Sequence, residues 1–137
     1  MMSADQPTTL HSAFICIGSN WGDRIKTVRQ AISHLVRITD SLWSSTIYET
    51  PAAGKDSDTP AYMNAVVKIR VNSDYPELNL MLKRMELEAG RNEECRNLGR
   101  VPLDLDIVEF DGEVLRPEDF RQKYYRIGRA GVAQQKD

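Results

Sequence analysis

Two amphipathic helices, each set between short apolar strands, constrain the fold of this chain more than any other feature. The first helix is predicted to begin after Asp23, a suitable N-cap, and its apolar stripe recurs every three or four residues at Ile25, Val28, Ile32 and Leu35. The second follows Asp74, with Pro76 in its first turn and Glu77 placed for a capping box. Its stripe comprises Leu78, Met81, Leu82, Met85 and Ala89, and Gly90 is expected to end it. Both helices therefore have one face to bury against other elements.

The strands predicted around these helices give the order of the fold. They are residues 13–17, 42–48, 62–71 and 103–110, and a tight turn at Asp111-Gly112 leads to a short strand at 113–115. The order β-α-β-β-α-β is typical of an α+β, ferredoxin-like fold, in which both helices pack on one face of an antiparallel sheet. We predict one domain over residues 11–125, a flexible tail at 1–10 and a poorly ordered tail at 126–137.

Composition excludes several classes of protein. A net charge of −2 argues against general nucleic-acid binding, which usually requires a strong basic excess, and no aromatic RNA-binding motif is found on the strands. No apolar run approaches the roughly 20 residues that cross a bilayer, and residues 1–10 lack the pattern of a secretory signal. Cys16 and Cys95 have no metal-site spacing, and we expect both to be reduced thiols in a cytoplasmic protein without a membrane partner.

Two aspartates in the last long strand are the strongest functional signal. Asp104 and Asp106 alternate with Leu103, Leu105 and Ile107, so both carboxylates lie on one face of the strand. Such a pair repels itself unless a cation is near, and Mg²⁺ suits oxygen ligands and bridges to substrate phosphates. The alternative at this point is a solvated polar face on an edge strand.

Other features could serve the same site. Gly18-Ser19-Asn20 ends the first strand, and two long loops span residues 49–60 and 91–102. The second loop carries Arg91, Arg96 and Arg100, whose guanidinium groups match phosphate oxygens. Tyr62 and Asn64 share a strand face and offer a ring and an amide to a planar heterocycle. Taken singly, each feature also reads as a turn, a solvated loop or the edge of the core.

Five stretches, in order along the chain, carry a family resemblance. They are Ile17-Gly18-Ser19-Asn20-Trp21-Gly22-Asp23-Arg24, Ser45-Thr46-Ile47-Tyr48-Glu49-Thr50-Pro51, Tyr62-Met63-Asn64-Ala65-Val66-Val67, Glu86-Leu87-Glu88-Ala89-Gly90-Arg91 and Leu103-Asp104-Leu105-Asp106-Ile107. Across residues 13 to about 116 the chain resembles 6-hydroxymethyl-7,8-dihydropterin pyrophosphokinase, a family of folate biosynthesis. The resemblance implies a ferredoxin-like fold and transfer of pyrophosphate from ATP to the pterin hydroxymethyl group, leaving AMP.

The resemblance also implies roles for individual residues. Asp104 and Asp106 fall where the family holds two Mg²⁺ ions that bridge the ATP phosphates, and Arg91 where an arginine assists the transferred phosphates. Ile107 falls near the nucleotide base. The positions that line the family's pterin pocket correspond to Thr50, Pro51, Ala53, Tyr62 and Asn64. The implied partners are thus ATP and a pterin, while the oligomeric state is left open.

The chain departs from the family pattern at three places. The family has Pro-Arg and two more residues before Asp-x-Asp, whereas here Arg100 precedes Val101-Pro102-Leu103, which puts Val101 in the arginine position. One residue reverses the face of a strand, so Arg100 can serve as a catalytic residue only if this segment is irregular. Lys123-Tyr124-Tyr125 replaces a Pro-His-Tyr run, leaving Tyr125 as the candidate ATP contact, and Ala130-Gly131-Val132 replaces Arg-Gly-Phe. The alternative hypothesis is a weak or inactive paralogue that binds a pterin, a nucleotide or a protein.

Overall fold

The computed structural model describes residues 9–52 and 60–133. The elements in chain order are β1 (His11–Ser19), α1 (Arg24–Ile38), β2 (Ser41–Ser44), β3 (Tyr48–Thr50), β4 (Tyr62–Val71), α2 (Tyr75–Glu88), α3 (Glu93–Asn97), β5 (Asp104–Phe110), β6 (Glu113–Val114), α4 (Pro117–Arg121) and α5 (Lys123–Ala133). The strands form one sheet in the order β2-β4-β1-β5-β6, and β3 pairs with β4 beyond the end of β2. Every pairing is antiparallel. The predicted α+β, ferredoxin-like arrangement is confirmed.

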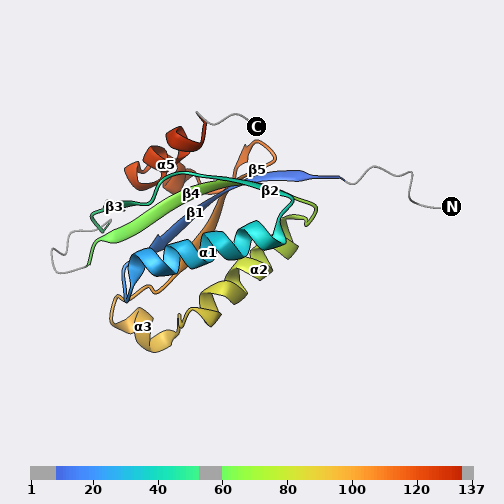
Figure 1. The fold of residues 1–137 in the computed structure, drawn as a ribbon. Coiled ribbons are helices and arrows are strands. Elements are labelled where there is room, and N and C mark those ends of the chain that lie inside the picture. The colour runs from blue at the N-terminus through green and yellow to red at the C-terminus, as the bar shows by residue number, and fades with distance from the viewer. Residues whose placement is uncertain (1–8, 53–59, 134–137) are drawn as a thin grey trace.

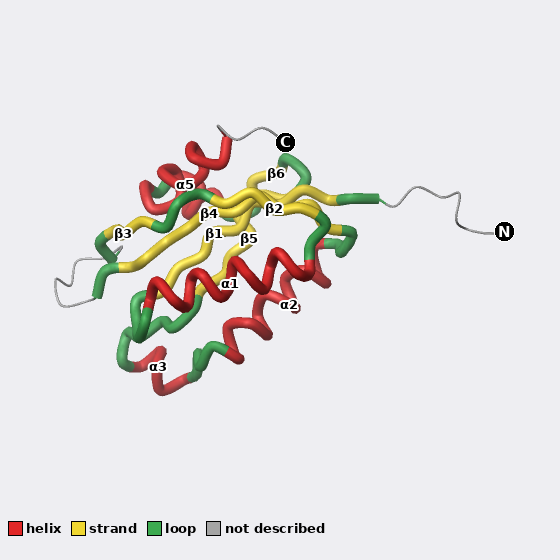
Figure 2. Tube along the Cα trace, viewed as in Figure 1, coloured by secondary structure: helices red, strands yellow, loops and turns green. Residues whose placement is uncertain are grey.

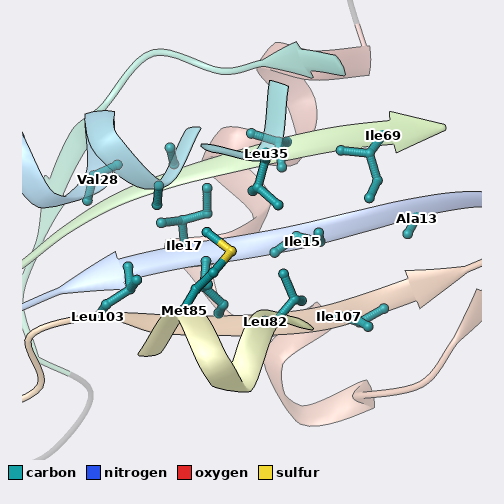
Figure 3. Close-up of a cluster of buried hydrophobic side chains, with 14 of the residues drawn as sticks. Ala13, Ile15, Ile17, Val28, Leu35, Ile69, Leu82, Met85, Leu103 and Ile107 are labelled. Atoms are coloured by element: carbon teal, nitrogen blue, oxygen red, sulfur yellow. The ribbon is translucent and has the colours of Figure 1, made fainter. Parts of the chain in front are cut away.

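The sheet has a helical layer on each face. Helices α1 and α2 lie side by side on one face, and α5 lies on the other (Figures 1 and 2). Alternation along β1 divides its side chains between the two layers, because Ile15 and Ile17 belong to the α1/α2 core whereas Cys16 packs toward α5. Figure 3 shows the larger core, in which Leu35 of α1 and Leu82 of α2 point toward the strands.

The predicted helix boundaries follow from caps that the structure confirms. The Asp23 carboxylate accepts from the Lys26 N–H at 3.2 Å, which begins α1. Asp74 and Glu77 form the expected reciprocal capping box of α2, with both hydrogen bonds at 3.0 Å. Gly90 follows α2 with a φ of 101°, a backbone conformation that glycine adopts more easily than other residues.

The strand predicted over residues 42–48 is two short strands, because a serine interrupts it. Backbone pairing with β4 continues at Ser45, whose N–H donates to the Val66 carbonyl at 2.9 Å. The Val66 N–H, however, donates to the Ser45 hydroxyl at 2.9 Å instead of to a backbone carbonyl. The ladder is therefore broken between β2 and β3, and pairing resumes in β3 with Tyr48 opposite Asn64.

The prediction of a poorly ordered tail from residue 126 is wrong over residues 126–133, which belong to helix α5. Tyr125, Gly128 and Val132 are buried on one side of this helix, and Tyr125 and Val132 pack in a cluster with Val66 and Val108. A hydrophobicity pattern does not reveal this buried side of the helix, because the residue in its middle is a glycine. A Cβ at Gly128 would lie 2.6 Å from both the Tyr48 hydroxyl and Val66 Cγ2, so this glycine lets the helix approach the sheet closely.

One predicted loop contains a helix, and other predicted segments lie partly outside the described residues. The charged loop predicted at 91–102 contains α3, which Asn92 caps by accepting from the Cys95 N–H at 2.8 Å. Within the loop predicted at 49–60, residues 53–59 lie outside the described part of the chain, as do residues 1–8 and 134–137 of the predicted tails. None of the helices described has the length and apolar character that a bilayer crossing requires.

Candidate active site

A cavity of about 300 Å³ opens on the α5 side of the sheet, where β1 ends and β4 and β5 begin. Its lining residues are Cys16, Gly18, Asn20, Thr50, Pro51, Ala52, Tyr62, Asn64, Gly99, Val101, Asp104, Asp106, Asp119 and Tyr124. The register explains the gathering, because Gly18 of β1 lies between Asn64 of β4 and Asp104 of β5. The antiparallel pairing thus brings three groups to one cavity: the end of β1, the Tyr62 ring and Asn64 amide of β4, and the two carboxylates of β5.

The two aspartates form an acidic corner of this cavity. Burial, and then the neighbouring Asp104 carboxylate, raise the pKa of Asp106 well above the usual range of a carboxyl group. Arg91 Nη1 binds Asp104 Oδ1 at 2.9 Å, while Lys83 Nζ and Arg116 Nη1 lie 3.7 Å and 3.9 Å from Asp106 Oδ1. The raised pKa means that Asp106 keeps its proton more readily than an ordinary carboxyl group, and a cation bound beside it would favour its charged form.

The donor set of this corner fits Mg²⁺ that arrives with a phosphate ligand. In the described part of the chain, no group of three or more His, Cys, Asp or Glu side chains is placed to hold a metal ion. Mg²⁺ is commonly bound by only one or two carboxylates, with water and substrate phosphates filling its remaining positions. Two carboxylates without histidine or thiolate are thus suited to Mg²⁺ that arrives with a phosphate ligand rather than to a resident metal.

The opposite side of the cavity presents an aromatic ring and an amide. Asn64, only 3% exposed, donates from Nδ2 to Thr50 Oγ1 at 2.7 Å, which fixes the plane of its amide. The Tyr62 ring covers Gly18, whose position would bring a Cβ to 3.2 Å from Tyr62 Cδ2. Burial and the Asp104 carboxylate raise the pKa of Tyr62, so its hydroxyl stays protonated at neutral pH. A flat heterocycle could stack on this ring and hydrogen-bond to this amide.

Replacing Gly18 by alanine is expected to impair this heterocycle site while the fold remains intact. The new methyl group would push the Tyr62 ring away from β1, and overpacking of this kind costs about 1–3 kcal/mol. We therefore expect roughly tenfold weaker binding of a flat heterocyclic ligand, measured by fluorescence titration. Near-wild-type affinity in the folded variant would show that the ring does not shape the site.

A clamp at the end of β1 holds the segment before β5. Asn20 Nδ2 donates to the Gly99 carbonyl at 3.1 Å, and Asn20 Oδ1 accepts from the Val101 N–H at 2.6 Å. The Asn20 N–H donates to the Val101 carbonyl at 2.9 Å, so one buried residue makes three hydrogen bonds to this segment. Val101 consequently lines the cavity, and the Arg100 guanidinium lies 3.9 Å from the centre of the Trp21 ring.

The structure brings most of the predicted site residues together. Thr50, Pro51, Tyr62, Asn64, Asp104 and Asp106 line the cavity, and Arg91 reaches its edge through Asp104. Arg100 precedes β5 in an irregular segment, as a catalytic role requires, yet its guanidinium rests on Trp21 instead of in the cavity. Ala53 lies outside the described residues.

The structure places the two remaining candidates away from the cavity. The Ile107 side chain is buried in the α1/α2 core, on the opposite face of β5 from the aspartates. Tyr125 is fully buried and donates its hydroxyl to Glu109. Neither side chain is among those that line this cavity.

One wall of the cavity carries no sequence motif that would mark it as a site. Tyr124 donates its hydroxyl to Asp119, and Arg116 binds the same carboxylate while facing Asp106. Asp119 and Tyr124 belong to α4 and α5, where the apolar pattern fades and no motif marks a site. Cys16 also lines the cavity, and burial raises the pKa of its thiol, which therefore stays neutral. The sequence indicates the position of Cys16 in one way: side chains alternate along β1, so Cys16 lies on the same face as Gly18.

Comparison with known proteins identifies the family. Residues 14–132 match the family described as 7,8-dihydro-6-hydroxymethylpterin-pyrophosphokinase. This chain belongs to that family. It is 33% identical over 105 residues to 2-amino-4-hydroxy-6-hydroxymethyldihydropteridine pyrophosphokinase of Aquifex aeolicus, and 37% identical over 109 residues to the protein of the same name in Bacillus subtilis.

The matches cover more of this chain than of its relatives in the family. Each of these two alignments includes 77% of this chain but 64% of the relative, so the chain spans just under two thirds of their length. The pyrophosphokinase of Haemophilus influenzae is 29% identical over 116 residues, which are 83% of this chain and 71% of the relative. The family match over residues 14–132 includes every residue that lines the cavity, from Cys16 to Tyr124.

Proposed function

We propose that the chain transfers pyrophosphate from ATP to 6-hydroxymethyl-7,8-dihydropterin, giving AMP, in folate biosynthesis. The hydroxymethyl oxygen would form a bond to the β-phosphorus of ATP while the bond from that phosphorus to the oxygen bridging it to the α-phosphorus breaks. The hydroxyl proton is lost, and AMP leaves with the bridging oxygen. The observation that carries this proposal is the single cavity that joins a carboxylate pair to a ring-and-amide wall.

Different residues of the cavity would contact the two substrates. Tyr62 would stack on the pterin, and the Asn64 amide, held by Thr50, would hydrogen-bond to its edge. Asp104 and Asp106 would hold Mg²⁺, which neutralises phosphate charge and orients the nucleotide when bound. Arg91 would contact the transferred phosphates from beside Asp104. Phosphoryl-type transfer depends chiefly on such positioning and charge compensation.

A steady-state assay of AMP release tests this proposal. The purified chain, given ATP, Mg²⁺ and the hydroxymethyl-dihydropterin, should release AMP at a rate that depends on all three. A chelator that removes Mg²⁺ should stop the reaction, and a pterin without the hydroxyl group should not support it. Pterin binding without AMP release would instead support the paralogue hypothesis, and ATP turnover that is independent of pterin would contradict the assignment.

The two arginines next to the site are expected to differ in importance. Arg91→Ala removes the guanidinium beside Asp104 and should lower kcat/KM by about 10²-fold or more, as for arginines that stabilise phosphoryl transfer. Arg100→Ala removes a cation–π contact with Trp21, worth about 0.5–1 kcal/mol at an exposed site, and should lower kcat/KM by no more than about fivefold. Equal losses in the two variants would show that Arg100 enters the site during turnover.

A further inference from the structure

The outer edge of β5 is held by side chains of α2 at the residue between the two aspartates. Within the described part of the chain, β6 pairs with β5 only at Glu109 and Phe110. Farther back, the Leu105 N–H donates to Glu86 Oε2 at 2.7 Å, and the Leu105 carbonyl accepts from Lys83 Nζ at 3.0 Å. At the part of β5 that carries the two carboxylates, these two side chains therefore make the hydrogen bonds that a neighbouring strand would otherwise make.

Glu86 is the centre of this arrangement. The residue is 5% exposed. Its Oε2 atom accepts hydrogen bonds from the Leu105 N–H and from Lys83 Nζ at 3.0 Å, and it forms an ion pair with Arg91 Nη1 at 3.3 Å. A buried carboxylate is costly unless it is hydrogen-bonded and paired with opposite charge. Core packing alone would favour an apolar residue here, beside Leu82 and Met85 on the buried side of α2.

The same carboxylate connects to both aspartates through its two cations. Arg91 Nη1, which contacts Glu86, also binds Asp104 Oδ1 at 2.9 Å. Lys83 Nζ, which contacts Glu86, lies 3.7 Å from Asp106 Oδ1. One buried group thus fixes the backbone between the aspartates and shares a cation with each of them.

We propose that Glu86 is a positioning residue that sets the geometry in which Asp104, Asp106 and Arg91 receive a metal–nucleotide. It touches no substrate and acts through the β5 edge and the two cations. This inference rests on the proposed function, because it concerns the same phosphate-binding corner. If Glu86 has this role, its replacement lowers the affinity for the metal–nucleotide even in a variant that remains folded.

The test compares Glu86→Gln with Glu88→Gln. The first variant keeps the size of the side chain and an oxygen for the Leu105 N–H, but removes the charge that holds Lys83 and Arg91. The second makes the same charge change at an exposed position two residues along α2. The probe is Mn²⁺ with α,β-methylene-ATP, whose binding is measured by calorimetry and by the electron paramagnetic resonance of Mn²⁺. Thermal unfolding is measured in parallel.

We expect Glu86→Gln to weaken binding of the probe by about tenfold or more, as losses of groups that orient metal ligands do. Glu88→Gln should bind within about twofold of wild type, because the side chain is exposed. In an Arg91→Ala background, the effect of Glu86→Gln should shrink to about threefold or less, because the path through Arg91 is then absent and only the contacts with Lys83 and the Leu105 N–H remain. A purely structural role would produce neither the loss of affinity nor this coupling.

The outcomes separate the inference from the function on which it rests. Wild-type affinity in a folded Glu86→Gln variant, with or without a lowered Tm, would overturn the inference and leave the function standing. Equal losses of affinity in the wild-type and Arg91→Ala backgrounds would overturn the proposed path through Arg91. Absence of probe binding by the wild-type chain would overturn both the proposed function and the inference.

Discussion

Asp106→Asn is expected to reduce AMP formation by at least about 10²–10³-fold while the fold is retained. Asparagine has nearly the same shape, so packing changes little, but the neutral amide cannot balance a divalent cation or the phosphates it carries. Removing a single electrostatic group from a preorganised site commonly costs this much in rate. Because the Asp106 side chain is largely shielded from solvent beside Asp104, water cannot easily replace the lost charge.

The measurement is the rate of pterin-dependent AMP release at saturating ATP, together with the Mg²⁺ concentration that gives half-maximal rate. Asp40→Asn supplies the matched control, because Asp40 is exposed in the turn between α1 and β2 and lies away from the cavity. Asp40→Asn should leave both quantities near wild type. Undiminished turnover in Asp106→Asn would remove Asp106 from the phosphate-binding corner.

Gly128→Ala is expected to produce the largest loss of stability among single-methyl changes on α5. Its Cβ would lie 2.6 Å from the Tyr48 hydroxyl and Val66 Cγ2, closer than any packed contact allows. The Gly128 N–H also donates to the Tyr48 hydroxyl at 3.1 Å, and Tyr48 in turn donates to the Tyr124 carbonyl. Overpacking of this kind costs about 1–3 kcal/mol, which exceeds the helix-propensity gain from glycine to alanine of about 1 kcal/mol.

Gly131→Ala provides an internal control on the same helix. A Cβ there would meet Ser45 Cβ at 3.7 Å, an ordinary contact, so only the propensity gain remains. Denaturant unfolding should show a lower midpoint for Gly128→Ala and an equal or higher midpoint for Gly131→Ala. Because α5 carries Tyr124 into the cavity, Gly128→Ala should also weaken substrate binding. Equal stabilisation by both changes would contradict the docked position of α5.

The fold was predictable from the sequence where periodicity and capping agree. Asp74 with Glu77 marks the start of α2, and the alternation around Asp104 and Asp106 places their carboxylates opposite the apolar core. Helix α5 was missed because its contact with the sheet depends on the absence of a side chain at Gly128. A hydrophobicity pattern detects what is buried and cannot detect close approach that a glycine permits.

The site was predictable only where neighbouring residues share a strand. Tyr62 and Asn64 lie two residues apart on one face of β4, so their shared position in the cavity wall is visible in the sequence. Glu86 and Leu105 are 19 residues apart, and a glutamate near the end of a helix normally suggests a solvated surface. Arg100 is the opposite case. Its place next to the family's arginine position made it a catalytic candidate, whereas in the structure its guanidinium lies on Trp21 and Val101, which Asn20 holds, lines the cavity.

Identification of the reaction products tests the central claim, transfer of pyrophosphate within this cavity, most directly. After turnover of ATP and 6-hydroxymethyl-7,8-dihydropterin by the purified chain with Mg²⁺, mass spectrometry and ³¹P NMR would identify the nucleotide and the pterin product. We expect AMP and the pterin diphosphate in equal amounts, with both reduced at least about 10²-fold in Asp106→Asn. ADP with a pterin monophosphate, or an unchanged pterin, would contradict it.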